Sequence, residues 1–173
     1  MNDLLTDLLH EFPRHKSLAD RAMIQLSDPE FFQKPAANVN PVALIVKHLA
    51  GNLVSRWTDF LTSDGEKPNR DRDGEFVLTE KDTRANLSAA WERGWQAVLD
   101  TVQSLRDADL DTLITIRGEP QTARQALLRG VTHAAYHTGQ ILYVARLLRP
   151  DSAWLTVAPG QSQSQPGTYR KSL

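Results

Sequence analysis

The chain has 173 residues, of which 40% are hydrophobic and 24% charged, so it suits one globular domain and is neither disordered nor fibrous in composition. Lysine and arginine number 20 against 21 aspartate and glutamate, with no dense basic block, which argues against nucleic acid as a partner. No apolar run approaches the roughly 18 residues of a membrane span, and the N-terminus carries acids where a signal peptide carries lysines, so we expect a cytoplasmic protein without membrane contact.

The first predicted helix spans residues 2 to about 27. Pro13 lies inside it, and because proline removes a backbone donor and crowds the preceding turn, we expect a kink or a break there. The apolar residues at helical spacing are Leu5, Leu8, Phe12, Leu18, Ala22 and Leu26.

A second helix is predicted from Asn40 to about Thr62, with Asn40 as its N-cap and Pro41 in its first turn. Its apolar stripe consists of Val42, Ile45, Val46, Leu49, Leu53, Trp57 and Phe60. Four polar residues fall beside that stripe: His48, Asn52, Ser55 and Asp59. A polar flank that borders a core is a place for a pocket.

A long crossover and a third helix follow. The segment "SDGEKPNRDRDGEF", residues 63–76, has no apolar period and is rich in glycine, proline, asparagine and charge. Thr79, followed three positions later by Asp82, resembles a capping box and is predicted to begin the third helix. The buried stripe of that helix is Leu87, Trp91, Gly94, Val98, Val102 and Leu105.

The segment "LITIRGEPQT", residues 113–122, is predicted to be a short extended turn or hairpin, too small to build a sheet. Thr122 with Gln125 forms a second capping-box pattern, which opens a fourth helix that runs to about Leu148. The predicted fold class is therefore all-α, a four-helix bundle with a long crossover between its second and third helices. We expect residues 1–150 to form the bundle and residues 151–173 to form a partly flexible C-terminal extension.

Two histidines of the fourth helix, His133 and His137, stand four positions apart and project from its inward side. Two buried imidazoles without partners are costly and resist protonation, and a divalent metal ion resolves both problems. The alternative is a pair of core histidines that are hydrogen-bonded to carbonyls or carboxylates. His48 lies on another helix whose flank can face the same interior, so we predict that three imidazoles converge; His10 and His15 lack this spacing and are left out.

Three neutral nitrogen ligands leave a metal ion with its full charge and an open position, which is typical of catalytic zinc sites. Zinc is the first choice, and nickel, iron or copper are also accepted by imidazole sites. Ala134 follows His133, so the glutamate of an HExxH metalloprotease is missing from its place. Cysteine is absent, so any thiol chemistry would need a thiol from outside.

"VKHLAGN" at residues 46–52, followed by "HAAYHTGQI" at 133–141, resembles the DinB (DNA-damage-inducible) superfamily, also called DinB/YfiT-like metalloenzymes. "NLVSRWTDFLTSDGEKPNRDRD", "WERGW", "TIRGEP" and "APGQS" resemble one branch of small proteins of unassigned function, and the resemblance covers nearly the whole chain. It implies a four-helix bundle with the metal ligands His48, His133 and His137. Asn52, Tyr136 and Gln140 occupy motif positions to which support or pocket roles fall, with a helix contact for Asn52 and packing for Tyr136 as the alternatives. Arg56 and Asp59, which follow Asn52 on the same helix, are further pocket candidates, with a surface or interhelix ion pair as the alternative.

Some members of that superfamily use low-molecular-weight thiols, so the resemblance implies a metal-dependent S-transferase that acts on a small molecule in stress or detoxification. A metal-dependent hydrolase is the first alternative, for which Asp59 and Glu92 are the candidates for a general acid or base. The second alternative is a non-catalytic bundle with a structural metal, in which the apolar surface and the tail serve association. We expect a homodimer.

Overall fold

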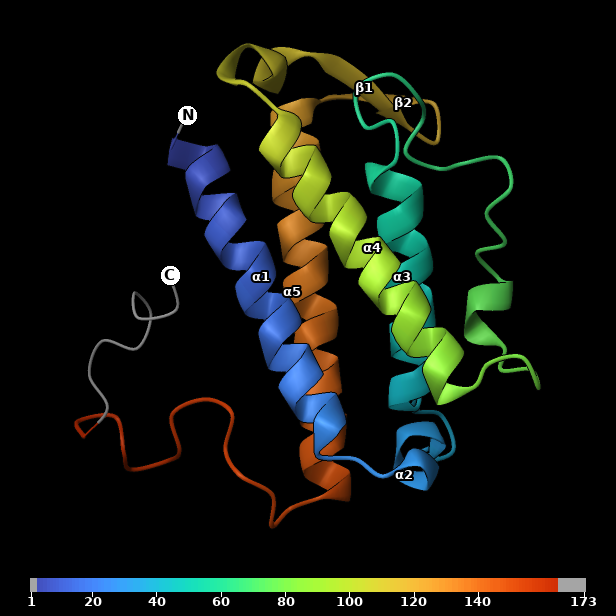
Figure 1. Cartoon of the computed structure of the whole chain (residues 1–173), viewed down its shortest axis with the longest axis vertical. Helices are drawn as coiled ribbons and strands as arrows, with labels where there is room; N and C mark the ends of the chain where they lie inside the picture. The colour runs from blue at the N-terminus through green and yellow to red at the C-terminus, as the bar shows by residue number, and fades with distance from the viewer. Residues whose placement is uncertain (1–2, 165–173) are drawn as a thin grey trace.

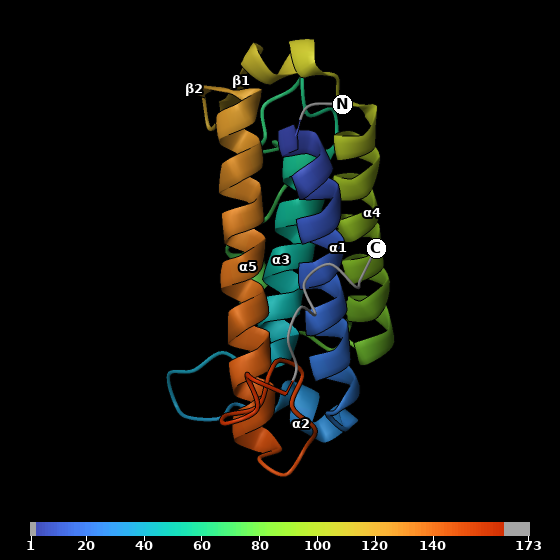
Figure 2. The ribbon, with the colours of Figure 1, turned by 90° about the vertical axis from the view of Figure 1, so that its left-hand side faces the viewer.

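Four long helices lie side by side along the molecule (Figure 1, Figure 2). The computed structural model describes residues 3–164. The long helices are α1 (Asp3–Ile24), α3 (Val42–Trp57), α4 (Arg84–Ser104) and α5 (Ala123–Leu148). The short elements are α2 (Asp28–Phe32), the 3-10 turns η1 (Gly74–Phe76) and η2 (Asp107–Asp111), and the strands β1 (Leu113–Ile116) and β2 (Glu119–Thr122).

The helices α1 and α5 run in one direction and α3 and α4 in the other (Figure 1). Each long helix packs against two others, in the pairs α1–α4, α4–α3, α3–α5 and α5–α1. Because α3 and α4 are parallel, the chain must return along the bundle between them, and residues 58–83 do so outside α3. The predicted all-α four-helix bundle with a crossover between its second and third long helices is confirmed.

The helix α1 continues through Pro13, so of the predicted kink or break the break is wrong, and the kink stays a prediction. Leu8 and Phe12 before the proline and Ala19 and Ala22 after it are all buried in one core. The burial of these side chains on both sides of the proline offsets the loss of the one backbone hydrogen bond that Pro13 removes.

The helix α3 begins at Val42 with Pro41 as its N-cap, and it ends at Trp57. The prediction placed its end near Thr62 because Phe60 continues the apolar spacing. Instead Asp59 takes a positive φ of 50°, and the chain turns there. Phe60 is nonetheless buried, because its ring stacks on Trp57 at 5.3 Å between centroids.

The helix α4 begins at Arg84, so the start predicted at Thr79 is wrong. The backbone N–H of Thr79 does donate to Asp82 at 2.7 Å, but the hydrogen bond closes a turn, and Lys47 binds the same carboxylate at 2.9 Å. The N-cap is Thr83, whose hydroxyl accepts from Asn86 N–H at 3.2 Å.

The predicted hairpin is present, and it covers one end of the bundle (Figure 1). Arg117 and Gly118 connect the strands with φ values of 58° and 74°, as a type I′ turn requires. Ile114 and Ile116 on β1 are buried. The short elements α2, η1 and η2 were not predicted.

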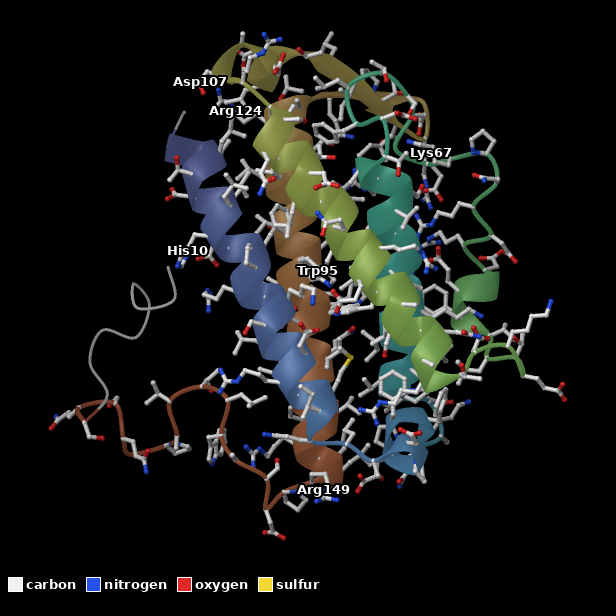
Figure 3. All side chains as sticks on the ribbon, viewed as in Figure 1. His10, Lys67, Trp95, Asp107, Arg124 and Arg149 are labelled. Atoms are coloured by element: carbon white, nitrogen blue, oxygen red, sulfur yellow. The ribbon has the colours of Figure 1, made fainter. Side chains whose placement is uncertain are left out.

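The core lies between the four long helices, and Trp95 points into its middle (Figure 3). The ring of Phe12 meets Trp57 edge-on at 5.2 Å and Trp95 at 6.4 Å, so α1, α3 and α4 share one aromatic contact. Within residues 3–164 no helix is both long and apolar enough to cross a membrane. The proposed division at residue 150 stays a prediction, and residues 165–173 of the predicted extension lie outside the described residues.

Two glycines of α5 have opposite surroundings. A Cβ added at Gly130 would lie 2.5 Å from Trp57 Cζ2, whereas one at Gly139 would meet nothing within 4 Å. We therefore expect Gly130→Ala to lower the free energy of unfolding by about 1–3 kcal/mol through overpacking of α3 against α5. The matched Gly139→Ala should raise it by about 0.5–1 kcal/mol because alanine favours the helix. Urea unfolding measures both, and equal effects would contradict the close approach at Gly130.

Candidate metal centre

The helices α3 and α5 bring three histidines together from positions far apart in the chain. His48, His133 and His137 each offer a ring nitrogen, and these atoms all lie within 4.8 Å of one another. The ring centroid of His48 lies 5.7 Å from that of His133 and 5.0 Å from that of His137. The convergence inferred from helical spacing is thus present in the fold.

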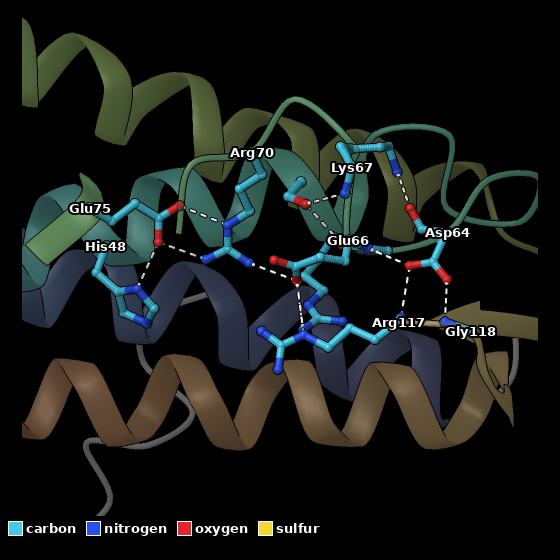
Figure 4. A network of polar contacts seen from close by, with 11 residues as sticks. His48, Asp64, Glu66, Lys67, Arg70, Glu75, Arg117 and Gly118 are labelled. Carbon is cyan, nitrogen blue, oxygen red and sulfur yellow. Dashed lines mark hydrogen bonds and ion pairs between the residues drawn. The ribbon is translucent and has the colours of Figure 1, made fainter. Parts of the chain in front are cut away.

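A buried carboxylate holds His48 in place. His48 Nδ1 lies 2.8 Å from Glu75 Oε2, a residue of η1 in the crossover (Figure 4). When Nδ1 donates its hydrogen to this carboxylate, the lone pair is on Nε2 and is free for a metal. The ring of the next residue, Phe76, stacks on His48 at 4.6 Å. Sequence reasoning missed Glu75, although a carboxylate partner is typical of a metal-binding histidine.

A side-chain amide holds His137 in the same way. His137 Nδ1 lies 2.8 Å from Gln140 Oε1, one turn further along α5. The amide oxygen accepts the Nδ1 hydrogen, so Nε2 of this ring also carries the lone pair. Gln140, which the resemblance placed in a support role, therefore orients His137.

The spacing of one pair of ring nitrogens and the burial of the cluster fit a divalent ion. His133 Nε2 lies 3.1 Å from His137 Nε2. Two nitrogens at about 2.0–2.1 Å from one tetrahedral ion lie about 3.3 Å apart, so this pair is spaced as two ligands of the same ion. His48 is 5% and His137 9% exposed, which keeps competing water low. The donor set of three imidazoles fits zinc, nickel, copper or iron.

The environment of His133 and His137 favours the neutral imidazole, the form that metal binding requires. Burial, with His137 and His48 beside it, lowers the pKa of His133 to about 3. Burial likewise lowers the pKa of His137, although the hydrogen bond with Gln140 opposes the shift. The pKa of Glu75 is also lowered: burial opposes ionisation, but hydrogen bonds from His48 and Arg70 outweigh it.

These shifts predict that the metal-free protein loses stability in mild acid. The unfolded chain takes up a proton on each histidine near its ordinary pKa of 6.5, while folded His133 stays neutral until about 3. The unfolded state thus binds more protons between these values, and the free energy of unfolding should fall as pH falls, by at most about 1.4 kcal/mol per pH unit for this group.

Denaturant unfolding in the presence of a chelator, between about pH 7 and pH 5, measures this slope. In His133→Gln the slope should be smaller because glutamine does not titrate. An unchanged slope in that variant would show that His133 does not couple folding to protons.

A cavity of about 240 Å³ opens beside the histidines, and His48 and His133 form part of its wall. Asn52 and Arg56, both predicted as pocket residues, line it too. Asp59 is exposed and lies outside this lining, and Arg56 pairs with Glu66 at 3.4 Å instead of with Asp59. The surface ion pair considered for Arg56 and Asp59 is therefore absent among the described residues.

Tyr136, another residue implied by the resemblance, lies at the outer edge of the site. Its side chain is 62% exposed, and its ring meets that of His137 edge-on at 5.0 Å between centroids. It does not line the cavity in the part of the chain described. Its placement suits a rim residue.

A polar network joins the histidine cluster to the hairpin (Figure 4). Arg70 donates from Nε to Glu75 Oε1 and from Nη2 to Glu75 Oε2, both at 2.7 Å, and from Nη1 to Glu66 at 3.1 Å. Further along, the Asp64 carboxylate accepts from the backbone N–H groups of Arg117 and Gly118 at 2.9 and 2.8 Å. These hydrogen bonds lower the pKa of Asp64, the one from Gly118 most. The crossover is thus fixed both to His48 and to the hairpin turn.

Fold and site together define a four-helix bundle with three histidines that could hold a metal ion between two of its helices. The chain belongs to the family described as "Protein of unknown function (DUF1572)", whose model matches residues 1–161. A crystal structure described as the conserved protein of locus from Enterococcus faecalis is similar in fold, with a TM-score of 0.66 and 16% identity over 87% of this chain and 100% of that chain. No protein with a curated description matches the chain.

Proposed function

We propose that this chain is a DinB-like protein that binds one divalent metal ion, zinc first, through His48, His133 and His137. We further propose that it transfers a low-molecular-weight thiol to a small electrophile. The observation that carries the proposal is the convergence of three imidazoles, of which His48 and His133 form part of the wall of a cavity. Three protein ligands beside an accessible space are typical of catalytic sites, whereas structural zinc sites are closed by four ligands.

The chain's own residues supply orientation and exclusion of water. Glu75 and Gln140 fix the ring orientation of His48 and His137, and Asn52 offers a buried amide to a ligand in the cavity. Trp57 and Ile116 supply apolar wall. A divalent ion bound there would lower the pKa of an external thiol, so that the thiolate is available near neutral pH. In the transfer the thiol sulfur forms a bond to carbon as the bond to the leaving group breaks, and the thiol proton departs with that group.

Hydrolysis is less well supported because no carboxylate lines the cavity among the described residues. Asp59 is exposed and outside the lining. Glu92, on the exposed side of α4, pairs with Lys16 at 2.9 Å. Neither carboxylate is placed to move a proton for a water molecule in the cavity.

The test is the reaction of zinc-loaded protein with a chromogenic aryl halide and, in turn, glutathione, bacillithiol and mycothiol. We expect acceleration with at least one thiol and none with His48→Ala, whose zinc content is measured in parallel. Cleavage of an ester or amide panel without thiol, lost on chelation, would favour the hydrolase. A zinc-dependent rise in melting temperature without any turnover would favour a structural metal.

A further inference from the structure

The cavity beside the histidines is strongly basic. Four arginines from four separate segments line it: Arg56 of α3, Arg72 of the crossover, Arg117 of the hairpin turn and Arg129 of α5. No aspartate or glutamate belongs to that lining in the described chain. An arginine set without facing carboxylates raises the local concentration of anions and holds planar or tetrahedral oxyanions by paired hydrogen bonds.

The carboxylates nearby do not neutralise these arginines. Glu66 is shared by Arg56 at 3.4 Å, Arg70 at 3.1 Å and Arg117 at 3.6 Å. Over residues 3–164, Arg72 and Arg129 have no ion pair at all. Arg70 also pairs with Glu75, but Arg56 and Arg117 share Glu66 among the described residues, so this wall keeps an excess of positive charge.

Arg56 carries the clearest sign of a missing partner. Its side chain is only 17% exposed, and its Nη1 is buried without a hydrogen-bond partner. Most buried side-chain polar groups in folded proteins have a hydrogen-bond partner, so a guanidinium nitrogen with no protein partner at a cavity wall is suited to bind a water molecule or a ligand there. Burial lowers the pKa of Arg56 to about 10, against the opposing charge of Glu66, so the group remains a cation near neutral pH.

The rest of the wall completes a small amphipathic site. Trp57, Phe60, Ile114 and Ile116 supply apolar surface to the same wall that the arginines and the two histidines line. The volume of about 240 Å³ suits a small molecule. A ligand that fits this wall has an oxyanion at one end and an apolar body.

We infer that the cavity binds a small organic anion, with its carboxylate or phosphate on Arg56, Arg117 and Arg129 and its other end toward His48 and His133. The inference deepens the proposed transferase function and rests on it, since the histidine end is where the reaction would occur. It names the substrate class: the thiol or the electrophile carries an oxyanion.

Isothermal titration with benzoate, phenyl phosphate and neutral benzamide tests the inference without any turnover. We expect saturable binding of benzoate or phenyl phosphate, weakened by salt, and none of benzamide. The better of the two anions shows whether the site prefers carboxylate or phosphate. Arg56→Met should lower the affinity for the anion by about tenfold or more. Arg93→Met, which removes the same charge from the exposed side of α4, should leave that affinity unchanged.

Two further variants separate this inference from the proposed function. Arg129→Met changes an exposed, unpaired arginine and keeps the test valid if Arg56→Met does not fold. His137→Ala removes a candidate ligand that does not line the cavity, and it should keep anion binding while it loses zinc. Anion binding lost in His137→Ala but kept in both arginine variants would place the anion on the metal and overturn the inference. A zinc-loaded protein that binds no anion would also overturn it, whereas absent zinc with intact anion binding would count against the proposed function alone.

Discussion

His137→Ala is expected to abolish stoichiometric metal binding. Two imidazoles would remain, one from each helix, and the pair of Nε2 atoms 3.1 Å apart would be gone. The loss of affinity should exceed the roughly 100-fold that marks the upper range for losing only an outer partner of a ligand. Elemental analysis of dialysed protein and competition with a chromogenic zinc chelator measure the change.

His48→Ala and His133→Ala should behave alike, because the three rings form one set. His15→Ala is the matched control, since His15 is a half-buried histidine of α1 that pairs with Glu11 at 3.6 Å, outside the cluster. One ion per chain in any of the three cluster variants would show that the set is not the ligand set. Loss of the ion in His15→Ala would point to a second site or to general unfolding.

The helices were predictable because each carries a long apolar stripe, and long stripes depend little on any single residue. The ends of the helices were less predictable. Thr79 and Asp82 make the hydrogen bonds of a capping box in a turn, and Phe60 keeps helical spacing after the helix has ended. Local patterns of three or four residues are shared by helices and turns, and tertiary packing decides between them.

The histidines could be found because His133 and His137 share one helix face and His48 sits on the flank of another. Glu75 could not, because it lies in a segment without periodicity, and only the path of the crossover brings it to His48. The one signal in this segment was Phe76, a single aromatic residue inside a charged, glycine-rich run. Such a residue indicates that the segment contacts the rest of the protein at that point, and Glu75 is its neighbour. The arginines of the cavity come from four segments, so no spacing rule could gather them. The homodimer and the cytoplasmic location stay predictions.

Glu75→Ala should lower both stability and metal affinity, and the two effects can be separated. Arg70 is 5% and Glu75 8% exposed at the side chain, so removing the carboxylate leaves a buried guanidinium with only Glu66 as its partner. Breaking such a pair costs about 3–5 kcal/mol of the free energy of unfolding. Loss of the partner of His48 Nδ1 should weaken zinc by about 10–100-fold.

Gly51→Ala provides an independent route to the same carboxylate. Gly51 lies one turn after His48, and an added Cβ would collide with Glu75 Oε1. The carboxylate is held by Arg70 and His48, so moving it loses those bonds. Gly51→Ala should therefore lower the affinity for zinc, as Glu75→Ala does, although it removes no polar group.

The double variant Arg70→Met/Glu75→Leu distinguishes the structural role of Glu75 from its role toward the metal. Replacing both members of a buried ion pair by apolar residues of similar volume is often neutral for stability, so the double variant should regain most of the stability that Glu75→Ala loses. Zinc affinity should stay low, because His48 Nδ1 still lacks the acceptor that fixes which ring nitrogen carries the lone pair. Recovery of both properties together would mean that Glu75 acts on the site only through the fold, and that the orientation of His48 does not depend on its carboxylate.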